Sequence, residues 1–112
     1  MGMFENLTKK RISSIIVNKT GRNLTIMECV PVIILNDAMP SITKHNGDGW
    51  YVLTNEGALF VDNYVVLDFE PIKSLTDIGN VIILELRDGT KVGIKPKHET
   101  ARKVVLSTTI SR

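Results

Sequence analysis

The chain has 112 residues, a formal net charge of +2, and 43% hydrophobic and 23% charged residues. These values are typical of one globular domain and exclude intrinsic disorder, while the small net charge does not indicate a nucleic-acid-binding protein. The single cysteine excludes an internal disulfide and a zinc site built from several cysteines.

The first third of the chain is open to two interpretations. Apolar side chains within residues 4–17 fall at helical spacing, but residues 11–17 are also rich in β-branched side chains that suit a strand. We favour a short N-terminal helical segment, followed by a hairpin that pairs 11–17 with 24–30. Pro31 then separates a further strand at 32–35.

The middle of the chain predicts a long loop and then a meander. Residues 36–49 are rich in Asn, Asp, Gly and Pro, and loops of this length often carry function. Three apolar, β-branched segments follow at 50–54, 58–61 and 64–68. Because only short turns separate them, they are predicted to pair as antiparallel strands.

A second hairpin is predicted towards the C-terminus. Residues 69–79, which contain Pro71, are predicted to be a connection rather than a strand. Segments 81–87 and 90–95 alternate in polarity and flank Asp88-Gly89, which is among the strongest hairpin signals in a single sequence. Pro96 is expected to end the pairing.

After Pro96 the apolar period changes from two to about 3.6. Residues 97–111 contain no Gly or Pro. Their apolar stripe comprises Ala101, Val104, Val105 and Thr108. The sequence therefore predicts a mainly β fold: an antiparallel bent barrel, or two packed sheets, of about seven strands with one C-terminal helix. Residues 1–112 form a single domain, with 1–10 as a short helical or flexible segment.

The order of these elements resembles a known family. An apolar strand ending in Leu-Thr at 50–54 is followed by a turn and the apolar strand 58–61. An Ile-containing segment after a proline at 70–78, the hairpin 81–94 and the terminal helix complete the pattern. Residues 50–110 thus resemble the bacterial pleckstrin-homology-like (PH-like) domains. The resemblance implies a bent seven-stranded barrel closed by one helix, which docks proteins, peptides or lipid headgroups.

The sequence offers no assembled catalytic machinery, and we expect neither enzymatic activity, nor a cofactor, nor a metal. His45 lies in the polar loop, and His98 lies where a helix is expected to start, which suits a capping or surface role. Cys29 lies in an apolar run and is expected to be a small buried hydrophobe. Four carboxylates that are candidates for acid–base work lie at turns and strand ends: Asp62, Asp68, Glu70 and Asp77.

Charge is unevenly distributed along the chain. Residues 1–45 carry six basic and three acidic side chains, residues 46–86 carry one and seven, and residues 87–112 carry seven and two. Such asymmetry either marks a surface for a partner or reflects internal complementarity between the acidic middle and the basic ends.

The basic end is the candidate binding site, because a cluster of cations can hold phosphate or an acidic protein surface. Its residues are Lys91, Lys95, Lys97, Arg102 and Lys103. The leading hypothesis is a non-enzymatic protein-interaction module that also self-associates, as a stand-alone regulator or inhibitor from a bacterium or phage. The alternatives are binding of anionic lipid or nucleic acid through this cluster, or a structural assembly subunit.

Targeting signals are not evident. No apolar stretch reaches the ~20 residues that a transmembrane helix needs, and the N-terminus lacks the basic-then-apolar order of a secretion signal. Gly2 is a myristoylation position, but Asn6 stands where that signal requires Ser or Thr. We therefore expect a cytoplasmic protein.

Overall fold

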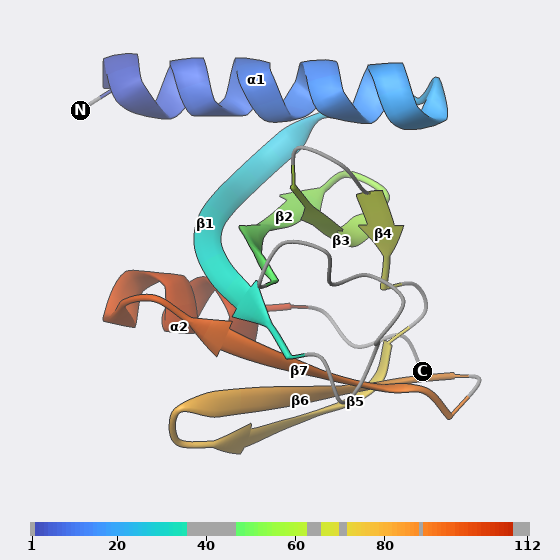
Figure 1. Cartoon of the computed structure of the whole chain (residues 1–112), viewed down its shortest axis with the longest axis vertical. Helices are drawn as coiled ribbons and strands as arrows, with labels where there is room; N and C mark the ends of the chain where they lie inside the picture. Colours follow the sequence, from blue (N-terminus) through green and yellow to red (C-terminus); the bar gives the residue numbers. More distant parts are fainter. Residues whose placement is uncertain (1, 36–46, 63–65, 70–71, 88, 109–112) are drawn as a thin grey trace.

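Over the residues that the structure describes, the chain folds into one antiparallel sheet of seven strands with two helices (Figure 1). The computed structural model describes residues 2–35, 47–62, 66–69, 72–87 and 89–108. The elements in chain order are α1 (Gly2–Thr20), β1 (Ile26–Ile34), β2 (Asp48–Thr54), β3 (Gly57–Val61), β4 (Val66–Asp68), β5 (Ile72–Ile78), β6 (Val81–Leu86), β7 (Lys91–Pro96) and α2 (Glu99–Leu106).

Strand β1 joins two halves of the sheet. The strand order is β4-β3-β2-β1-β7-β6-β5, so β1 pairs with β2 on one side and with β7 on the other. We call β1 to β4 the first half-sheet and β5 to β7 the second half-sheet. Figure 1 shows β1 as a long curved strand that leads from one half to the other. Among the described strands the sheet does not close, because β4 and β5 are its two edges.

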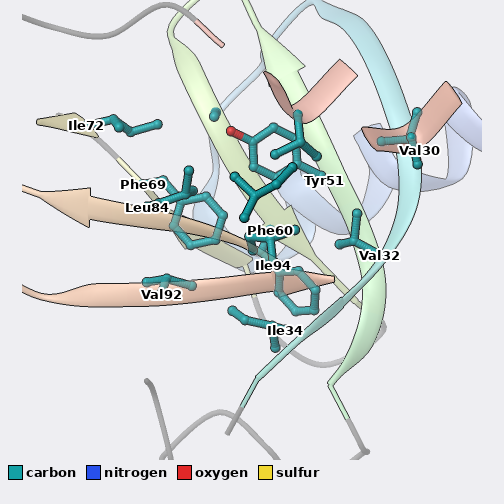
Figure 2. Packing of buried hydrophobic residues seen from close by; sticks show 14 of the residues in the cluster. Val30, Val32, Ile34, Tyr51, Phe60, Phe69, Ile72, Leu84, Val92 and Ile94 are labelled. Carbon is teal, nitrogen blue, oxygen red and sulfur yellow. The ribbon is translucent and has the colours of Figure 1, made fainter. Parts of the chain in front are cut away.

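The bend gives the sheet an inner face with its own core. Alternate residues of β1, β2 and β3 point to this face, together with residues of the second half-sheet and of α2. Tyr51 and Phe69 stack with ring centroids 5.9 Å apart in this core. Figure 2 shows side chains from both half-sheets meeting there.

A second core lies on the outer face of the first half-sheet, beneath α1. Val52 and Leu59, which alternate with inner residues along their strands, meet Ile12 and Ile16 of the helix. Figure 1 shows α1 lying across β1 to β4 on the side away from β7. The first half-sheet is thus covered on both faces, which explains the uninterrupted buried run along β3.

Local chemistry explains why helix α1 ends at Thr20. Gly21 has a φ of 73°, a left-handed conformation that glycine adopts at little cost, and its N–H donates to the Val17 carbonyl at 2.9 Å. The hydroxyl of Thr20 donates to the Ile16 carbonyl at 2.7 Å. These bonds satisfy carbonyls that the end of a helix leaves without partners.

The predicted hairpin of 11–17 with 24–30 is wrong, because residues 11–17 belong to α1. Their β-branched side chains suit a strand locally, but the helix is favoured because it buries Ile12 and Ile16, which lie one helical turn apart.

The predicted break at Pro31 is also wrong, since β1 runs through it. The Pro31 carbonyl accepts from the Lys97 N–H at 3.2 Å, at the end of the β1–β7 ladder. Proline has no backbone N–H, and at the end of a ladder the hydrogen bond that it cannot donate costs little stability.

The predicted connection at 69–79 is wrong as well, because β5 occupies Ile72–Ile78. This strand is polar and pairs with β6 only, so its own sequence lacks the apolar alternation of a half-buried strand. A bulge between Ile72 and Ser74 further interrupts its period.

Most other expectations for the C-terminal half are confirmed. Strands β2, β3, β6 and β7 and the helix α2 form, β6 pairs with β7 as a hairpin, and β7 ends at Pro96. Helix α2 is shorter than the predicted 97–111. The mainly β, antiparallel class with seven strands is confirmed too. Loop residues 36–46, the start of the predicted strand 64–68, and Asp88 lie outside the described residues.

Candidate functional site

A pocket of about 610 Å³ opens at one end of the bent sheet. We call it the mouth pocket. It lies between the start of β1, the β2–β3 turn, the start of β5 and the end of α2. Its lining residues are Met27, Glu28, Leu53, Thr54, Asn55, Glu56, Gly57, Ala58, Ile72, Ser107 and Thr108.

The mouth pocket combines an apolar lining with an acidic rim. Leu53, Ala58 and Ile72 belong to or pack against the inner core. Met27 is 59% exposed. It falls where the β1–β2 register shifts between Ile26 and Glu28, and such a bulge re-aims a side chain. No sequence pattern indicated this pocket, because a bulge of one residue does not interrupt an apolar run.

Two carboxylates on the rim differ in their surroundings. Glu56 lies 3.3 Å from the Arg22 guanidinium, which also contacts Asp68 at 2.7 Å. The hydrogen bond that the Arg22 guanidinium donates to Glu56 is the main factor that raises the pKa of Arg22. Glu28 is exposed and makes no ion pair with any residue that the structure describes. Its exposed carboxylate gives the rim a negative charge, while the Lys9 ammonium donates to the neighbouring Met27 carbonyl at 3.4 Å.

The Tyr51 hydroxyl and Thr108 Oγ1 share a hydrogen bond of 2.7 Å that ties the end of α2 to the inner core. Burial of the Tyr51 ring raises the pKa of its phenol to about 12, against the smaller opposing effect of the Thr108 hydrogen bond. The phenol is therefore neutral at physiological pH.

The five predicted cations do not form one cluster. Lys97 pairs with Asp48, and Arg102 pairs with Asp77 and, at 3.7 Å, with Glu99. Both cations are thus held by carboxylates of the chain itself.

The other three cations are available. Lys91, Lys95 and Lys103 make no ion pair within the part of the chain that the structure describes, and all three are exposed. Lys91 and Lys95 alternate with the core residues Val92 and Ile94, so they point from the outer face of the second half-sheet.

The uneven charge along the sequence is in part internal complementarity. Arg22, from the basic first block, pairs with Glu56 and Asp68 of the acidic middle. Lys97 and Arg102, from the basic last block, pair with Asp48 and Asp77 of the same middle block. The fold thus brings both basic ends onto the acidic segment.

The residues considered for catalysis have structural surroundings. His98 is the N-cap of α2, where its Nδ1 accepts from the Ala101 N–H at 3.1 Å, which confirms the predicted capping role. Cys29 is half-buried and packs against the core beneath α1, so it is less buried than predicted. His45 lies outside the described residues. Among the described residues, no three His, Cys, Asp or Glu side chains gather as metal ligands.

Comparisons with protein-family models, curated proteins and solved structures found no match to this chain. In the described part of the chain, no helix has the length and apolar character needed to span a membrane.

Proposed function

We propose that the chain is a non-enzymatic protein-interaction domain with a PH-like barrel, and that the mouth pocket holds an apolar side chain of a partner protein. The observation that carries the proposal is the pocket of about 610 Å³ with its apolar lining and acidic rim. Pockets of this size commonly bind by apolar contact, with a few polar groups that fix orientation.

The strand order supports the PH-like part of the proposal. The first four strands and the last three each pair in sequence, and β7 returns to pair with β1. This is the winding expected of a bent seven-stranded barrel that is open between β4 and β5. Helix α2 contributes Ala101 and Val105 to the inner core, as a closing helix would. Helix α1 is an addition beyond that pattern.

The rim indicates the chemistry of the partner. Met27 offers a flexible thioether side chain, which adapts to varied apolar groups. Glu28, with its exposed carboxylate, favours a basic residue beside the apolar one. We therefore expect a partner segment that carries an apolar side chain next to Lys or Arg.

A displayed library of random peptides tests this function. Selection on the full chain should enrich peptides with an apolar residue beside a basic one. Met27→Glu should weaken their binding about tenfold or more, because it places a third carboxylate at an apolar contact. Leu7→Glu is the matched control, since Leu7 is 58% exposed on α1 and does not line the pocket. No enrichment, or equal binding by both variants, would contradict the proposal.

A second candidate is docking on an anionic membrane surface. The observation that favours it is that Lys91 and Lys95 lie on the outer face of the second half-sheet, on either side of Gly93, which faces the half-buried Ile83. Lys91 itself faces Glu85. Each cation near such a surface contributes about 1 kcal/mol. Co-sedimentation with phosphatidylserine vesicles should fall steeply as salt rises, and should weaken in Lys95→Glu. Absence of binding at low salt, with oligonucleotides as a parallel probe, would eliminate it.

A further inference from the structure

Strand β5 is the long free edge of the sheet. The other edge strand, β4, has three described residues and contacts α1. β5 has seven residues and, within the described ranges, pairs with β6 alone. A free edge of that length presents backbone N–H and C=O groups that another strand can pair with.

The side chains of β5 are unusually open for a strand. Lys73, Thr76 and Asp77 are exposed, and Ile78 is 63% exposed. Ile78 pairs with Val81 beside the turn into β6, and its side chain stays largely exposed.

Two β5 strands from separate copies are complementary to each other when they run antiparallel. About Leu75 as the centre, Lys73 faces Asp77, Ser74 faces Thr76, and Leu75 faces its own copy. Opposite charges, hydroxyl pairs and apolar pairs are each favourable across neighbouring antiparallel strands. At the two ends, Ile72 faces Ile78.

We propose that two copies of the chain associate through β5, antiparallel and centred on Leu75, so that one sheet continues into the other about a two-fold axis. Such an interface uses the same surface of both copies, which a self-complementary strand satisfies. The pairing uses the edge of the sheet rather than the mouth pocket. It therefore goes beyond the proposed function, and its test is independent of the test of the pocket.

The charges on β5 make the edge selective. A lysine and a bulge on an edge strand discourage pairing with arbitrary strands. Lys73 lies next to the bulge, its side chain is 63% exposed, and its ammonium is 3.9 Å from the Glu85 carboxylate. This loose contact leaves the ammonium able to reach a carboxylate across the edge. A second β5 supplies that carboxylate at the matching position.

Asp77 retains capacity for this contact. Its Oδ1 accepts from the Gly79 N–H at 3.0 Å, and its Oδ2 accepts from Arg102. A carboxylate offers about four acceptor positions, so the ammonium of Lys73 from the second copy adds to these bonds without displacing them.

Sedimentation velocity of the full chain over a range of concentrations tests the proposal. The wild type should reach the mass of two chains. Lys73→Glu and Asp77→Lys should each weaken the dimer about tenfold or more, because each places two like-charged pairs across the edge. An equimolar mixture of the two variants should restore a dimer, since every charged pair is again opposite in sign. Lys10→Glu, which reverses an exposed charge on α1, should sediment as wild type.

A cross-linking measurement covers the case in which Asp77→Lys fails to fold after losing Arg102. In a Cys29→Ser chain, Leu75→Cys should form an intermolecular disulfide under mild oxidation, because residue 75 faces itself across the axis. Thr76→Cys should not, since its copies are diagonal neighbours about 7–8 Å apart. A monomer at all concentrations, a dimer indifferent to Lys73→Glu, a mixture that does not reassociate, or equal cross-linking at 75 and 76 would each overturn the proposal.

Discussion

The two half-sheets of this protein are built from similar residues but are covered differently. β3 in the first half-sheet is buried along four consecutive residues, because the inner core lies on one face and α1 on the other. β6 in the second half-sheet is as apolar over Val81 to Leu84, yet only alternate residues are buried. The difference shows that an apolar run does not by itself tell whether a strand is covered on one face or two.

The largest expected effect comes from removing a contact between α1 and the first half-sheet. Ile16→Ala should lower the free energy of unfolding by about 2–4 kcal/mol, because Ile16 is almost completely buried there. Ile83→Ala is the matched change on the half-exposed outer face of the second half-sheet and should cost less than about 1 kcal/mol. Urea unfolding measures both. Equal costs would mean that the two outer faces are covered alike.

High pH should test whether the two half-sheets unfold together. Tyr51 lies in the core that they share, and its pKa of about 12 in the folded chain exceeds the ordinary value of 10. Folding therefore favours the neutral phenol: its contribution is complete below pH 10 and is lost as pH rises through 12. The loss is roughly 3 kcal/mol.

The measurement is urea unfolding between pH 9 and about 12, followed by Trp50 fluorescence and by far-ultraviolet circular dichroism. Trp50 is the single tryptophan and lies in the first half-sheet. We expect the two signals to change together. Tyr51→Phe, which cannot ionise, should show a shallower decline, and an unchanged pH dependence in that variant would contradict the assignment.

A smaller effect is expected at the cap of α2, the helix that closes the inner core. His98→Ala should cost about 1 kcal/mol, because it leaves the Ala101 N–H without its side-chain acceptor. His98→Asn should retain most of the stability, since asparagine is a favoured N-cap residue. Thermal unfolding distinguishes the two, and equal losses would contradict the capping role.

The smallest effect on monomer stability is expected at the free edge. Ile78→Ser should change the free energy of unfolding by less than about 0.5 kcal/mol in dilute solution, since the side chain is largely exposed. A larger loss, measured in the same urea titration, would show that Ile78 is covered within one chain.

Local chemistry predicted the parts of the fold that local contacts form. The β6–β7 hairpin, the end of β7 at Pro96 and the cap at His98 each depend on residues close together in the sequence. The mainly β class followed from the same signals. The number of strands agrees because wrong assignments cancel: 11–17 is helical, Pro31 does not divide β1, and β5 was predicted to be a connection.

Distant contacts decided the parts that were predicted wrongly. Residues 11–17 are helical because the outer face of β2 and β3, some 40 residues later, receives Ile12 and Ile16. β5 is a strand because β6 pairs with it, although its own side chains are mostly polar. Distant contacts also explain why the five predicted cations do not form one cluster. The fold brings Asp48 to Lys97 and Asp77 to Arg102, and these residues are far apart in the sequence.

The place of β1 between both half-sheets has a consequence for how the chain folds. Hairpins β2–β3 and β6–β7 close short loops, whereas Val32 must find Pro96 across more than half of the chain. Because closing a long loop costs more entropy than closing a short one, we expect the β1–β7 seam to form late. Until then the two halves are separate folding units, and the exposed strand edges at the seam are where misassembly would begin.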